Sequence, residues 1–254
     1  MNYKLSICLP AHRAHLWENL YNSAIFSVGE EYSWEMVVVG PNDPSPFFAS
    51  KKNFKFLKDF GSPSRCAQIA TTLADGELMV GAVDDGLFTK NSLNQCIKVL
   101  DALPRKDVVA TRYTEGRGYA GNPMHPEYWM AHHHPTLRVV PEDYKVILLG
   151  MFRTDYFREI GGWDCEFEHL NMNYHDLAFR IQRDGGVVHM SPQVVINCDW
   201  NPNEGDHIPV QQAYDQHDLT LFNKIYSGES PDRIKIDYFN WKNSPLVWKR
   251  RFGG

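Results

Sequence analysis

Three short apolar segments constrain the fold of this chain more strongly than any other feature. Residues 5–9, 36–39 and 78–83 are apolar almost throughout, without the polar alternation of a half-exposed strand. Such strands are typical of sheets that are covered on both faces. With a shorter strand expected at 54–57 and segments of helical apolar period between, the order is strand, helix, strand, strand, helix, strand, helix. This alternation predicts an α/β domain with a mostly parallel, Rossmann-like sheet and helices on both faces.

The predicted helices of the first half cover residues 14–27, 65–74 and a segment around 93–100 that ends at Pro104. Ser64 is the expected N-cap of the second of these helices. The second half of the chain is less regular. Its pattern predicts strands at 107–113, 145–151, 187–189 and 194–197, helices at 154–160, 176–184 and 211–222, and a loop-like stretch at 114–144. A loop of that length in a compact domain is usually functional or poorly ordered.

Composition excludes several classes of protein. The 254 residues, 43% of them hydrophobic, suit one α/β domain or one domain with an appendage. A net charge of −5 provides no basic field for nucleic acid. No apolar run reaches the roughly 20 residues of a membrane span, and the first ten residues have no signal-peptide layout. Because the five cysteines are scattered and form no CxxC pair, we expect a reducing, cytoplasmic location.

Two adjacent carboxylates, Asp84 and Asp85, follow the apolar segment 78–83. Carboxylates at the end of a buried strand are costly to bury without a partner, and that end of an open α/β sheet is where ligands bind. Mg²⁺ or Mn²⁺ takes one or two protein carboxylates together with phosphate oxygens and water. The pair therefore indicates a metal and phosphate site. The alternative is a plain turn, since Asp85-Gly86 is a common hairpin signal.

Five features occur in the order found in family 2 glycosyltransferases, and the chain resembles that family over roughly residues 4 to 200. They are the 5–10 strand, Arg65, the end of the acidic strand at 83–85, the Gly-Gly-Trp-Asp turn at 161–164, and His175-Asp176 with Arg180. The resemblance implies a GT-A fold and an inverting transfer from a nucleotide sugar to a glycan or glycoconjugate acceptor. Uridine is the nucleoside that it implies.

The resemblance implies a role for each residue on the donor side. Asp85 would ligate Mn²⁺ or Mg²⁺, Asp84 would contact the ribose or nucleotide, and Val83 departs from the family's acidic triplet. Arg65 matches a basic residue that contacts the donor, although a cation in the first turn of a helix is otherwise unfavourable. The segment Pro10, Ala11, His12 and Arg13 would lie beside the base and ribose. Gly40 replaces an acid that reads the base in relatives, with Asn42 or Asp43 as possible substitutes.

On the acceptor side, the resemblance implies that Asp176 is the general base. Inverting transfer needs a carboxylate that takes the proton of the attacking hydroxyl, and an Asp at a helix N-terminus stays ionised. The alternative is a helix N-cap with an i,i+4 pair to Arg180. His175 replaces the usual Glu, and Trp163 with Asp164 would line the acceptor pocket. His207 is the candidate for a further metal ligand, with Asn197 and Asp199 as alternatives.

The predicted domain organisation is a transferase domain over residues 1–205 and an extension over 206–254. Within the domain, residues 1–110 would bind the nucleotide sugar and 111–205 the acceptor. Residues 238–252 mix aromatic side chains with four basic ones. We expect them either to touch an anionic membrane at its inner face or to pack as a strap on the domain or on a second subunit.

Two other functions remain open on the sequence. A sugar-phosphate nucleotidyltransferase would need a Gly-rich phosphate loop directly after the first strand, and residues 9–13 contain no glycine. A degenerate transferase that binds nucleotide or glycan without catalysis agrees with the departures at Gly40, Val83 and His175. Turnover with a matched donor would distinguish it from an enzyme.

Overall fold

The computed structural model describes residues 2–115, 125–128, 145–198, 207–226 and 233–244. Their strands form one mixed sheet in the order β3-β2-β1-β4-β8-β6-β9-β5, with β7 paired to β6. The predicted mostly parallel sheet is found in the first half of the chain, where β1 pairs in parallel with β2 and β4, and β2 with β3. These four strands are β1 (Tyr3–Pro10), β2 (Trp34–Gly40), β3 (Phe54–Lys58) and β4 (Gly76–Gly81).

The second half of the sheet is mixed in direction. β8 (Met151–Arg153) runs antiparallel to both β4 and β6 (Val108–Glu115), and β9 (Val188–Cys198) runs parallel to β6. The short strands β5 (Gly86–Phe88) and β7 (His125–Tyr128) pair antiparallel with β9 and β6. Two predictions were wrong here: the strands expected at 187–189 and 194–197 are one strand, and residues 145–150 precede β8 as irregular backbone.

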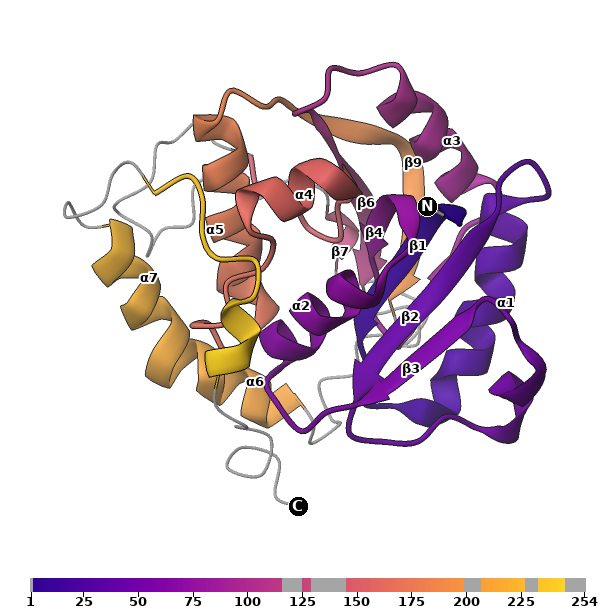
Figure 1. Ribbon diagram of the computed structural model, residues 1–254, viewed down its shortest axis with the longest axis horizontal. Helices are drawn as coiled ribbons and strands as arrows, with labels where there is room; N and C mark the ends of the chain where they lie inside the picture. The colour runs from indigo at the N-terminus through magenta and orange to yellow at the C-terminus, as the bar shows by residue number, and fades with distance from the viewer. Residues whose placement is uncertain (1, 116–124, 129–144, 199–206, 227–232, 245–254) are drawn as a thin grey trace.

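Helices cover both faces of the sheet, as predicted (Figure 1). Successive side chains of a strand point to opposite faces, so Ile7 joins the core under α1 (Trp17–Val28) and α3 (Ser92–Asp101), whereas Cys8 joins the core under α2, α4 and α5. Those three helices are α2 (Pro63–Leu73), α4 (Thr154–Ile160) and α5 (Leu170–Arg183). Short 3₁₀ turns, Ala14–Leu16 and Pro46–Ser50, precede α1 and β3.

Two helix starts differ from the sequence prediction. The side chain of Ser62, not that of Ser64, accepts the backbone N–H of Arg65 and caps α2 at 3.1 Å. Helix α5 begins at Leu170 rather than at Asp176. The apolar residues Leu170 and Met172 and the buried amide of Asn173 already fit a helix packed on the core, which extends α5 by more than one turn. Asp176 therefore lies inside the helix, not at its N-terminus.

The C-terminal part contains α6 (His207–Ala213), a π-helical turn (Tyr214–Asp218) and α7 (Leu219–Tyr226), in agreement with the predicted helical segment. Helix α7 packs Phe222 and Tyr226 against Phe179 of α5. Residues 233–244, which we call the strap, then cross α2 and end in the 3₁₀ turn Asn240–Asn243 (Figure 1). No helix among the described residues is long and apolar enough to cross a membrane.

Candidate active site

The carboxyl ends of β1, β2 and β4 lie at one edge of the sheet and bring the predicted donor residues together. Asp84 lies in the turn after β4, 4% exposed. Its Oδ2 accepts the backbone N–H groups of His12 and Arg13 at 2.7 and 2.6 Å, and its Oδ1 accepts Nε and Nη2 of Arg13 at 2.9 and 2.6 Å. Asp84 thus fixes the loop after β1 instead of pointing a free carboxylate outward. Its predicted ribose contact stays a prediction.

Asp85 is the neighbouring carboxylate, with 10% of its side chain exposed. Its Oδ2 lies 3.4 Å from Nη1 of Arg13, so a single guanidinium faces both acids of the pair. Asp84 accepts four hydrogen bonds from the loop after β1, and the metal-ligand role of Asp85 stays a prediction. One carboxylate completed by diphosphate oxygens and water is a usual environment for Mg²⁺.

A larger metal cluster is not found in the described ranges, where no group of three or more His, Cys, Asp or Glu could hold a metal ion. His207 begins α6, but its side chain and residue Asp199 lie outside the described part of the structure. Their roles as metal ligands therefore stay predictions. Asn197 lies on β9, where its Oδ1 accepts the hydroxyl of Thr114 at 2.7 Å.

Gly40 ends β2 at the place where relatives were expected to carry an acid. A Cβ at this position would come within 1.8 Å of the Ala11 carbonyl oxygen, so the close approach of the two loops leaves room for glycine alone. The side chain of Asn42 donates its amide to the His12 carbonyl at 2.7 Å. Asp43 instead forms a surface ion pair with Lys58 at 2.7 Å. Of the two candidate substitutes, Asn42 is the one attached to the donor loop.

Arg65 is held by groups of the protein itself. Its guanidinium donates hydrogen bonds of 3.0 to 3.2 Å to both carboxylate oxygens of Asp59. It also donates to the backbone carbonyls of Trp241 and Ser244. The Trp241 ring lies 5.3 Å from the guanidinium carbon. The cation in the first turn of α2 is therefore satisfied by an acid and by the strap. Contact with the donor stays a prediction for Arg65.

The Gly-Gly-Trp-Asp turn at 161–164 is tightly built into the core. Gly161 and Gly162 have positive φ values of 99° and 68°, which an L side chain adopts with difficulty. Trp163 is 5% exposed and packs its ring edge-on against Phe157 and Tyr174. Its flat face is therefore not open to a sugar in this structure, and its acceptor role stays a prediction.

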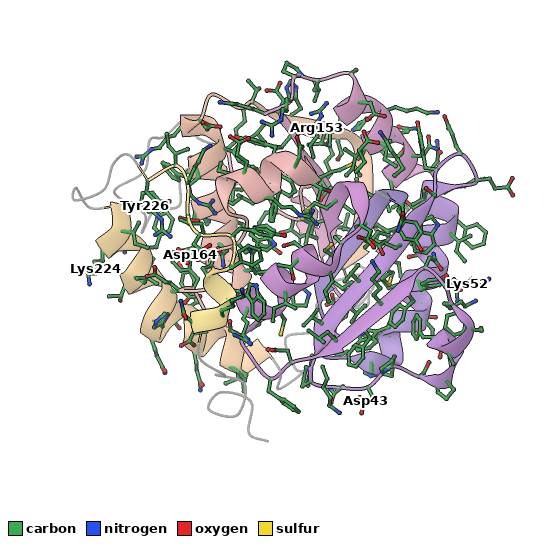
Figure 2. The ribbon with its side chains drawn as sticks, viewed as in Figure 1. Asp43, Lys52, Arg153, Asp164, Lys224 and Tyr226 are labelled. Atoms are coloured by element: carbon green, nitrogen blue, oxygen red, sulfur yellow. The ribbon has the colours of Figure 1, made fainter. Side chains whose placement is uncertain are left out.

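Asp164, Asp176 and their partners form a buried charged network. Asp176 is completely buried; its Oδ2 accepts Nε of Arg180 at 2.8 Å and its Oδ1 accepts the Tyr226 hydroxyl at 2.5 Å. Asp164 pairs with Arg233 of the strap. Burial and the nearby charge of Asp176 raise the pKa of Asp164. Figure 2 shows Asp164 and Tyr226 in the half built from α5 and α7, away from Asp43 below β3.

This network contains residues that sequence reasoning missed. Tyr226 and Arg233 are 50 and 69 residues away from the acids they contact, so no local pattern marks them. Asp218 was also missed; it is fully buried and accepts the backbone N–H groups of Glu168 and His169 at 2.9 and 2.8 Å. His175, the predicted acceptor residue, is 3% exposed and packs near Phe222.

Comparison with solved structures identifies the architecture. S. aureus TarS 1–349 in complex with UDP superposes with a TM-score of 0.58 at 14% sequence identity, over 90% of this chain and 73% of TarS 1–349. The complex of the same fragment with UDP-GlcNAc gives the same TM-score and identity over 95% of this chain. TarS is a glycosyltransferase.

The chain has a GT-A-type fold.

A longer S. aureus TarS structure aligns at a TM-score of 0.56 and 16% identity, and the chain spans 42% of its length. No protein-family model and no curated protein sequence matches the chain. The GT-A-type likeness therefore rests on the course of the backbone. Ligands of open α/β sheets bind outside the carboxyl ends of the strands, and Asp84, Asp85 and Arg13 meet at that edge.

Proposed function

We propose that this protein transfers a sugar from a nucleoside-diphosphate sugar to a hydroxyl of a glycan or glycoconjugate acceptor, with inversion. The observation that carries the proposal is the cluster of Asp85, Arg13 and the Asp84-bound loop at the carboxyl edge of a GT-A-type sheet. The UDP and UDP-GlcNAc complexes of TarS support a uridine nucleotide as the donor.

The donor side of the proposed site has the charges that this chemistry needs. Breaking the sugar–phosphate bond leaves a nucleoside diphosphate with new negative charge, which fixed positive groups stabilise. Arg13 supplies a guanidinium that Asp84 holds in place. Mn²⁺ or Mg²⁺ on Asp85 would add Lewis-acid stabilisation of the same diphosphate.

The acceptor side is less open than the donor side. A base has to reach the attacking hydroxyl directly or through one water, but both oxygens of Asp176 are hydrogen-bonded inside the protein. For Asp176 to act as the base, an acceptor hydroxyl or a bridging water has to reach Oδ1 beside the Tyr226 hydroxyl or in its place. The substitution Asp176→Asn, argued in the Discussion, tests this role separately from donor binding.

A nucleotide screen tests the proposed function. A ligand that binds only the folded state raises the free energy of unfolding by about 2.7 kcal/mol when its free concentration is 100 times its Kd. We therefore expect UDP with Mn²⁺ to raise the melting temperature more than ADP or CDP does. Release of UDP from UDP-sugars in the presence of acceptor glycans then measures turnover. Binding without turnover across a donor and acceptor panel would favour the degenerate, binding-only protein, and the absence of any nucleotide-dependent shift would reject both.

A further inference from the structure

Arg13 stands between the two carboxylates of the acidic pair. Two of its nitrogens donate to Oδ1 of Asp84 at 2.9 and 2.6 Å, while its Nη1 lies 3.4 Å from Oδ2 of Asp85. The backbone N–H of Arg13 also binds Asp84. Backbone and side chain of one residue are thus held by the same buried acid, so the guanidinium has little freedom to swing away.

The fixed position of Arg13 has an electrostatic consequence for Asp85. A divalent cation held by Asp85 would compete with the guanidinium for this carboxylate and would be repelled by it, although Asp84 offsets part of the guanidinium charge. Only 17% of the Arg13 side chain and 10% of the Asp85 side chain are exposed. An arginine does not lose its proton in a protein, so this repulsion is not relieved by titration.

We propose that Arg13 is a built-in counter-charge for the diphosphate and competes with the divalent cation for Asp85. It follows that part of nucleotide binding is independent of metal, and that Arg13 weakens the affinity of Asp85 for the cation. A guanidinium is well suited to this role, because its planar donors match phosphate oxygens. The inference rests on the proposed function and assigns the charge that holds the diphosphate.

The substitution Arg13→Met separates this proposal from simple damage to the site, because it predicts changes of opposite sign. Calorimetric titration with UDP in EDTA should show binding by the natural protein and about tenfold weaker binding by Arg13→Met, whereas the affinity for Mn²⁺ alone should rise by about tenfold on removal of the like charge. Arg105→Met is the matched control. Arg105 precedes β6, at the opposite edge of the sheet, and forms a surface ion pair with Asp155 of α4.

Two further variants keep the proposal testable if Arg13→Met folds poorly. Arg13→Lys keeps the charge and should not gain Mn²⁺ affinity. Asp85→Asn should lose the effect of Mn²⁺ on UDP binding and keep the binding measured in EDTA. Equal losses with and without Mn²⁺ in Arg13→Met, or abolished EDTA binding in Asp85→Asn, would overturn the inference while leaving the proposed function in place. Failure of the natural protein to bind any nucleoside diphosphate would instead reject the proposed function.

Discussion

At the residue scale, two buried aspartates show how environment decides the use of a carboxylate. Asp84 accepts four hydrogen bonds from the loop after β1 and holds that loop in place. Asp176 accepts hydrogen bonds from the guanidinium of Arg180 on α5 and from the hydroxyl of Tyr226 on α7. Breaking a buried ion pair by removing one partner usually costs more than the pair contributes, because the remaining charge stays buried. Asp176 therefore forms a structural ion pair with Arg180, and its predicted role as the base is a separate question.

We expect Asp176→Asn to lower the free energy of unfolding by about 3–5 kcal/mol, since it leaves the fully buried Arg180 without its counter-charge. Urea unfolding measures this change. If Asp176 is the base of the proposed transfer, turnover per folded molecule should also fall by about 10²–10⁴-fold. Asp155→Asn is the matched control, because Asp155 pairs with Arg105 on the surface and such pairs contribute about 0–1 kcal/mol. Near-normal turnover per folded molecule in Asp176→Asn would reject Asp176 as the base and leave it the role of a buried ion pair with Arg180.

At the element scale, the strap joins parts of the molecule that are far apart in sequence. Gln68 of α2 is fully buried and donates to the carbonyls of Gly161 and Tyr238 at 3.1 and 2.7 Å, while its carbonyl accepts the N–H of Trp163 at 2.8 Å. Asn240 of the strap accepts the N–H of Cys165 at 3.0 Å. One side chain thus holds the 161–164 turn and the strap against the same helix.

Gln68→Leu should detach the strap locally. The substitution leaves three backbone groups without their partner, and each buried group left unsatisfied costs about 1–3 kcal/mol. We expect a lower midpoint of urea unfolding and faster amide hydrogen exchange over residues 236–244. Gln193→Leu is the comparison, since the amide of Gln193 makes an exposed bond to the Lys90 carbonyl. Unchanged exchange in the strap of Gln68→Leu would show that other contacts, such as Arg65 to Trp241, hold it.

At the scale of the whole molecule, charge is unevenly distributed. The chain has a net charge of −5, yet residues 238–254 contain four basic residues and no acid. In the described part of this segment, Phe239 is 49% exposed and Lys242 lies 4.6 Å from the centre of its ring. An aromatic and basic surface beside the N-terminus of α2 suits the interface of an anionic membrane. Membrane contact therefore stays a prediction with a defined location.

Vesicle flotation tests that contact. We expect binding to vesicles that contain phosphatidylserine and not to neutral ones, weakened by salt, with about 1 kcal/mol from each basic residue near the surface. Replacing Lys249, Arg250 and Arg251 by Gln should remove most of the binding. Lys51→Gln with Lys52→Gln is the control, because these lysines lie on the β3 side of the sheet. Equal flotation of the natural and triple-substituted proteins would leave only the packing role for residues 238–252.

The sequence alone determined the α/β class, the parallel half of the sheet and the acidic turn after β4. Those features are local, because an apolar strand, a helical period or a pair of adjacent carboxylates can each be recognised within a short stretch of sequence. The mixed half of the sheet was harder to predict, because β8 has three residues and β9 contains Pro192 and a register shift. Strand direction there is decided by packing rather than by pattern.

Only the tertiary structure decided what each predicted site residue touches. Asp84, Arg65 and Asp176 were all predicted to act on substrates, and each is held by protein partners that lie from 4 to 179 residues away. Except for the i,i+4 pair of Asp176 with Arg180, which the helical spacing already indicated, these contacts join chain segments that meet only after folding. The sequence set the chemistry available at the sheet edge. The fold decided which charges face a ligand and which face one another.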